Sequence, residues 1–167
     1  RPTRYATGEE PMIEALNALS VTLYVAAACH LGGRLAHTSG PTQSLPKVTV
    51  ALVGGALVFH ALILYSIILT EGGINLGFFH AASLIAWVIA ALAITAALFG
   101  PAGSLSVFVM PLAALTIVLS AVFPSHRDAA LSTGVQVHIT VSVIGYGTLT
   151  LAALQAALVW AQDRALR

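Results

Sequence analysis

The sequence predicts an all-α, polytopic membrane protein, and three observations lead to this fold class. Five long apolar runs account for most of the 167 residues, and about 20 residues of helix are needed to cross roughly 30 Å of hydrocarbon. The seven basic and six acidic residues all lie at or beyond the ends of these runs. The runs also lack the period-2 alternation of barrel strands. Since lipid leaves backbone groups no outside partner, each run is expected to form a helix.

The overall composition agrees with this fold class and excludes one class of partner. The chain is 58% hydrophobic and 8% charged, whereas a soluble domain carries roughly 25% charged residues. A formal net charge of +1 provides no basic face, so nucleic acid is not expected as a partner.

The predicted spans and connections follow from these runs and from the turn-forming residues between them. The spans are residues 12–35, 48–70, 78–99, 105–123 and 137–162. Gly, Pro or both occur in each of the connections after the first four spans, which predicts turns. Residues 125–136 are expected to form a polar loop. No internal repeat is visible, so residues 1–167 are expected to form one transmembrane domain.

The basic residues predict how the chain is oriented in the membrane. Four of them belong to one side and three to the other: Arg34, Lys47, Arg164 and Arg167 against Arg1, Arg4 and Arg127. Basic residues are enriched in cytoplasmic connections. We therefore expect the amino terminus outside and the carboxy terminus in the cytoplasm.

Four of the six histidines are candidate ligands of a cofactor. In the predicted orientation His80, His126 and His138 lie at the outer surface, and His60 lies within the second span. Neutral imidazole is a common metal ligand and a usual axial ligand of haem iron. An ionisable residue at membrane depth is also a functional candidate by default, because burying it unpaired is costly.

Each of these histidines also has a structural interpretation. His60 can equally be a neutral residue that hydrogen-bonds a Ser, a Thr or a carbonyl of a neighbouring helix. His126 can be a solvated loop residue and His80 an interfacial one, and we interpret His30 and His37 as structural.

Other catalytic patterns are absent from the sequence. There is no His-Glu-x-x-His, Walker loop, Cys-x-x-Cys or Gly-x-Ser-x-Gly motif. No carboxylate lies in the interior of a span, which argues against a proton-driven transporter. No nucleophile is marked either, so a carrier or assembly factor is favoured over an enzyme.

The fifth span carries a pattern that resembles a known family. It opens with His138, continues with small and apolar residues, places Tyr146 eight positions later, and ends residues 137–158 with an Ala/Leu-rich run. This order resembles one helix of the CcsA/CcmC cytochrome c assembly superfamily. There the histidine that opens the helix faces the outside and handles haem. The resemblance implies that His138 is an axial ligand of haem iron.

Other segments are similar to the YpjD/HemX-like branch of that superfamily, a set of bacterial inner-membrane proteins. These segments are Phe-His-Ala at 59–61, residues 77–87, and the Phe-Pro ending of the fourth span. The resemblance covers roughly residue 47 to the end. The family's Trp-rich haem-binding segment and second outer histidine do not occur here, so either the chain is the amino-terminal part of a longer fold or the site is reduced.

The resemblance implies a protein that holds and presents haem at the outer face of the membrane, with cytochrome c maturation proteins as partners. Two alternatives remain open. One is a cofactor-free structural subunit of a larger membrane complex, which the smooth Ala/Leu/Val spans suit. The other is a transporter or transport accessory, supported by Pro111 and His60 alone.

Overall fold

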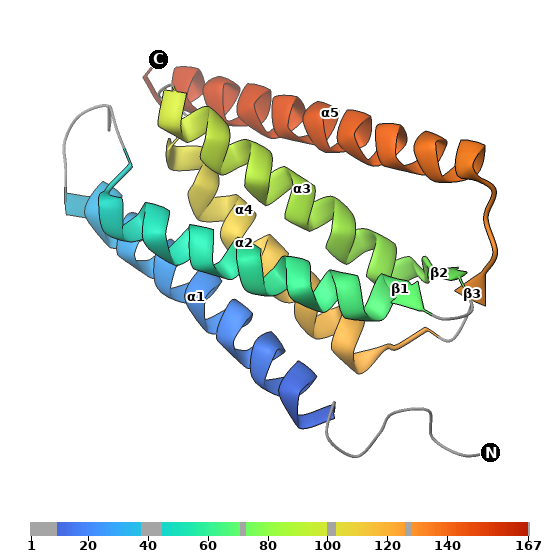
Figure 1. Cartoon of the computed structure of the whole chain (residues 1–167). Helices are drawn as coiled ribbons and strands as arrows, with labels where there is room; N and C mark the ends of the chain where they lie inside the picture. Colours follow the sequence, from blue (N-terminus) through green and yellow to red (C-terminus); the bar gives the residue numbers. More distant parts are fainter. Residues whose placement is uncertain (1–9, 38–44, 71–72, 100–102, 126–127, 167) are drawn as a thin grey trace.

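In the part of the chain that the structure describes, five long helices contain most of the residues, and Figure 1 shows how they are arranged. The computed structural model describes residues 10–37, 45–70, 73–99, 103–125 and 128–166. The helices are α1 (Glu10–His37), α2 (Lys47–Ile68), α3 (Phe78–Phe99), α4 (Gly103–Val122) and α5 (Thr133–Leu166). Each is long and apolar enough to cross a membrane, as expected for a multi-pass membrane protein.

The first four helices form an antiparallel bundle. α1 packs against α2 and α4, and α3 packs against the same two helices, so the four close into a ring. Each turns a buried stripe inward with steps of three and four residues; on α3 this stripe includes Ser83, Ala86, Ala90, Ala93 and Ala97. That spacing keeps side chains on one helical face. The small residues allow close approach in a medium that supplies no hydrophobic drive.

The fifth helix lies outside this ring. α5 runs along α3 and makes few contacts with α4, and Figure 1 shows it at the edge of the molecule. It docks through Leu151, Leu154 and Leu158, which pack against the core, and through Gly147. A Cβ at Gly147 would lie 3.0 Å from Val88 Cγ1, so a larger side chain would push the helices apart.

A small antiparallel sheet joins two connections at one end of the bundle, which we call the sheet end. Its strands, in the order β1-β2-β3, are Leu69–Thr70, Gly73–Asn75 and Asp128–Ala129. Asn75 donates from Nδ2 to the Ser125 carbonyl at 2.6 Å and accepts from the Gly77 amide at 3.3 Å. The sheet thereby ties the chain between α2 and α3 to the chain that leads into α5.

Glycine is required at two positions of this junction. Gly73 has φ +126°, and a Cβ there would collide with the Ala129 carbonyl across the sheet. A Cβ at Gly77 would collide with the Ser125 side chain. Both close contacts join the α2–α3 connection to the segment that precedes α5.

The prediction of five apolar helices is confirmed, and the third span agrees at both ends. The prediction of a purely loop-like connection before the fifth span is wrong. Residues Asp128–Ala129 form β3, because their backbone groups pair with those of β2. α5 then begins at Thr133, four residues before the predicted start of the fifth span. The connection at 36–47 lies partly outside the described residues. Which terminus faces the outside stays a prediction.

Candidate functional site

A chain of three hydrogen-bonded side chains crosses the interior of the bundle. The Tyr24 hydroxyl of α1 lies 3.4 Å from His60 Nδ1 of α2, and His60 Nε2 lies 2.9 Å from Ser83 Oγ of α3. All three residues are essentially fully buried. The Tyr24 and His60 rings meet edge to face, with centroids 5.9 Å apart. These contacts link α1, α2 and α3 through one imidazole.

Both ring nitrogens of His60 are used in this chain. A neutral imidazole has one N–H donor and one acceptor nitrogen. If Tyr24 donates to Nδ1, then Nε2–H donates to Ser83; in the other tautomer Nδ1–H donates to Tyr24 and Ser83 donates to Nε2. Either direction satisfies the ring. For His60 to coordinate a metal, one of these hydrogen bonds would have to be released.

The chain lies in a layer of polar residues contributed by all four helices of the ring. Ser20 on α1 and Ser120 on α4 are buried like His60 and Ser83, and the Ser20 hydroxyl donates to the Ala56 carbonyl of α2 at 3.1 Å. Because α3 ends at Phe99 and α4 begins at Gly103, the antiparallel arrangement brings Ser120 close to the level of Ser83. The four residues therefore occupy one level, nearer the sheet end.

Two further hydrogen bonds hold α2 against its neighbours. Trp87 Nε1 donates to the Leu57 carbonyl at 2.9 Å, one turn of α2 from His60. At the opposite end, His30 Nδ1 lies 2.9 Å from Thr49 Oγ1, and Thr49 is fully buried. Our interpretation of His30 as structural agrees with this contact.

His80 lies on the buried face of α3, one turn closer to the sheet end than Ser83. Only 4% of its surface is exposed, so it belongs to the bundle interior. Aromatic rings adjoin this end of α3: Phe78 and Phe79 are edge to face at 5.2 Å, and Phe79 stacks on Phe123 at 5.0 Å. These rings pack beside the junction between the two connections.

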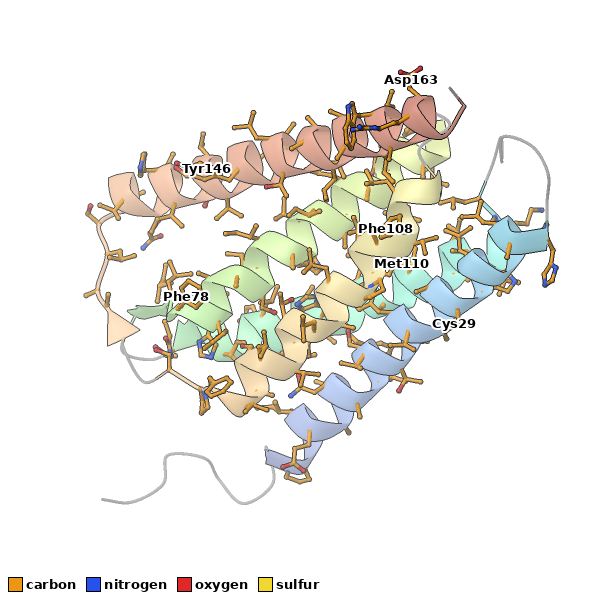
Figure 2. All side chains as sticks on the ribbon, turned by 180° about the vertical axis from the view of Figure 1, so that it is seen from behind. Cys29, Phe78, Phe108, Met110, Tyr146 and Asp163 are labelled. Atoms are coloured by element: carbon orange, nitrogen blue, oxygen red, sulfur yellow. The ribbon has the colours of Figure 1, made fainter. Side chains whose placement is uncertain are left out.

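His138 occupies a different environment, near the start of α5. It is exposed, and nine residues separate it from Gly147, which faces α3. Nine residues turn a helix through about 900°, or two and a half turns, so His138 lies on the side of α5 opposite to α3. Figure 2 shows side chains projecting from α5 away from the bundle, where none of the described helices covers them.

The structure therefore brings together some of the predicted ligands and separates others. His60 of α2 and His80 of α3 both lie in the interior of the bundle. His138 is at the sheet end like His80, but it points away from α3, so the two rings do not face each other. His126 lies outside the described residues. Within the described ranges no three His, Cys, Asp or Glu side chains cluster in a way that could hold a metal ion.

Two residues of the interior chain, Tyr24 and Ser83, were not singled out from the sequence. A usable signal was present in the buried-stripe spacing: Ser20 and Tyr24 are four residues apart, and Ser83 begins a run of small residues at steps of three and four. A hydroxyl on such a stripe points inward. The pairing of these hydroxyls with His60 depends on the register between helices, which a single sequence does not give.

Comparison with known protein families, with curated proteins and with solved structures finds no match for this chain.

Proposed function

We propose that this chain is a cytochrome c assembly-type protein of the bacterial inner membrane that holds haem at the outer face, with His138 as an iron ligand. The proposal takes the sheet end as the outer end, in line with the distribution of basic residues. Its supports are the sequence pattern that opens the fifth span and the position of His138.

The single observation that carries the proposal is the accessibility of the His138 ring. It is exposed at the sheet end of α5, on the face opposite to the α3 contact. The residues between Thr133 and Tyr146 are exposed or half-buried, with none fully buried. An imidazole so placed has its nitrogens available to a planar ligand that approaches from this side. Haem would supply an iron that imidazole nitrogen coordinates.

The same geometry assigns a different role to His60. Its two hydrogen bonds hold α1, α2 and α3 together, so it supports the bundle on which α5 rests. The second ligand of the iron and the walls around the porphyrin would come from the far side of α5, where another membrane subunit or a cytochrome c maturation protein would dock. His60, His80 and His126 stay predicted ligands of lower rank than His138.

Absorption spectroscopy of the purified chain in bilayer discs tests the proposal. After haem loading we expect a Soret band whose position and intensity change strongly in His138→Ala. His37→Ala is the matched control, because His37 is also exposed but lies at the opposite end of the bundle. A spectrum that is the same in wild type and His138→Ala would refute the assignment.

A second candidate function is a structural subunit without a cofactor, and one observation favours it. α5 is the least buried of the five apolar helices, so a larger complex could cover it. This function predicts that the chain copurifies with other membrane subunits, that the complex lacks a Soret band contributed by this chain, and that His138→Ala assembles normally.

A further inference from the structure

Two buried serines on α4 have hydroxyl groups without a hydrogen-bond partner in the part of the chain that the structure describes. They are Ser106, 1% exposed, and Ser120, 5% exposed. Fourteen residues separate them, which corresponds to nearly four full turns, so both lie on the inward stripe of the same helix. An unpaired buried hydroxyl is costly. The two positions differ in what surrounds them.

The surroundings of Ser106 are apolar. It lies with Val53 of α2, Ala90, Ala93 and Ile94 of α3, and Val109 and Met110 of its own helix. These side chains leave no room for a water molecule. A water here would also have the Ser106 hydroxyl as its single polar neighbour, whereas a buried water typically makes two to four hydrogen bonds. Ser106 therefore lies in a dry part of the core.

The level of the bundle at which Ser120 lies also carries polar side chains of α1. Gly32 of α1 lies against Val107 of α4, since a Cβ there would be 3.8 Å from Val107 Cγ1. Counted from this contact, 13 residues toward the sheet end lead from Val107 to Ser120 on α4, and from Gly32 to a position between Asn17 and Ser20 on the antiparallel α1. Ser120 therefore lies at the level of Asn17 and Ser20. Asn17 continues the inward stripe of α1, and its Oδ1 is buried without a hydrogen-bond partner among the described residues. Two unsatisfied polar atoms thus share one level of the bundle, on two helices that pack together.

We propose that the polar layer at the level of Ser120 binds ordered water between α1 and α4. The ligand must donate to Asn17 Oδ1 and pair with the Ser120 hydroxyl, and water does both. A third partner is available in the layer, because the hydroxyl of Ser20, which donates to Ala56, still has acceptor capacity. The site therefore supplies the two to four partners that hold a buried water.

This water site extends the Tyr24–His60–Ser83 chain into a polar layer in which all four helices of the ring take part. The α1–α2, α2–α3 and α1–α4 contacts would each then include a polar link at the same level. The inference is independent of haem binding, since it uses neither His138 nor the uncovered face of α5.

Solid-state NMR of the full chain in lipid bilayers tests the site directly. Magnetisation is transferred from water to the protein in serine-labelled samples, and the Ser106 and Ser120 signals are assigned by their loss in Ser106→Ala and Ser120→Ala. We expect early transfer to Ser120 and late transfer to Ser106. Equal, late transfer to both serines would show a dry layer and overturn the proposal.

The same two variants give a second measurement. Ser106→Ala removes an unpaired hydroxyl from a dry site, so we expect the folding equilibrium constant to stay unchanged or to rise. Ser120→Ala removes a water partner and leaves Asn17 Oδ1 less satisfied, which should lower that constant about fivefold, corresponding to about 1 kcal/mol. A Ser120→Ala effect no larger than that of Ser106→Ala would contradict bound water.

Discussion

α2 and α5 both lie against α3, and each carries a histidine, yet the two histidines occupy opposite environments. His60 is fully buried and hydrogen-bonded at both ring nitrogens. His138 is exposed and turned away from the bundle. Both were candidate ligands, His60 for its predicted depth in the membrane and His138 for the resemblance carried by the fifth span. The comparison shows that the face of a helix on which a histidine lies decides whether its nitrogens are available.

The two helix contacts with α3 also differ in their chemistry. α2 is held by polar links, with His60 to Ser83 and Trp87 to the Leu57 carbonyl. α5 is held by leucines and by the close approach at Gly147. Hydrogen bonds between membrane helices fix register, whereas packing of small and apolar residues allows close contact. α2 is therefore expected to be fixed in one arrangement, and α5 to depend on shape alone.

Replacing His60 should affect stability most. His60→Ala removes two interhelical hydrogen bonds, leaves Tyr24 and Ser83 with unsatisfied hydroxyls, and opens a cavity in a packed layer. We expect a loss of about 2–4 kcal/mol in the free energy of unfolding, measured by denaturant titration in mixed micelles. The matched control is His138→Ala, for which a surface change within about 0.5 kcal/mol is expected. Equal losses in the two variants would mean that the environments of the two rings do not differ as described.

Gly145 and Gly147 of α5 allow the packing contact between α5 and α3 to be tested separately from other changes in the helix. In Gly147→Val the new side chain meets Val88 of α3, whereas Gly145 has nothing within 4 Å of an added Cβ. We expect Gly147→Val to cost about 1–3 kcal/mol through overpacking and Gly145→Val to have little effect. Disulfide cross-linking between cysteines placed on α3 and α5 measures the contact, and its efficiency should fall only in Gly147→Val. If the two variants cross-link alike, α5 does not dock through Gly147.

Much of the fold could be predicted because the bilayer imposes it. A run of about 20 apolar residues has few alternatives to a helix, and for this reason the third span was located at both ends. The sheet could not be predicted in the same way. Its strands are two or three residues long, and the pairing of β2 (Gly73–Asn75) with β3 joins segments more than 50 residues apart. A local pattern contains no information on such a pairing.

The candidate site was predictable only in part. The sequence indicated that His60 lies in a span and that its ring needs a partner, and a Ser was among the partners considered. Identifying Ser83 and Tyr24 required the relative rotation of three helices. The direction of His138 relative to α3 was also inaccessible, because it depends on which face of α5 docks, and both faces of that helix carry small and apolar residues.

The smallest effects on stability are expected when the two hydrogen bonds of His60 are removed one at a time. The Tyr24 contact is long, at 3.4 Å, and the Ser83 contact is short, at 2.9 Å; hydrogen bonds weaken as their length exceeds about 3.2 Å. Tyr24→Phe keeps the ring against the imidazole and removes only the hydroxyl, so we expect a cost of about 0.5 kcal/mol. Ser83→Ala should cost about 1 kcal/mol, because it removes the shorter bond.

A double-mutant cycle with His60→Ala separates the pairwise contribution from the loss of packing. A coupling energy larger for Ser83 than for Tyr24 is expected, since the Ser83 bond is the shorter of the two. If the Tyr24 coupling were the larger, the edge-to-face ring contact at 5.9 Å rather than the Ser83 bond would fix the position of the imidazole. In that case α1, and not α3, would be the helix that orients His60.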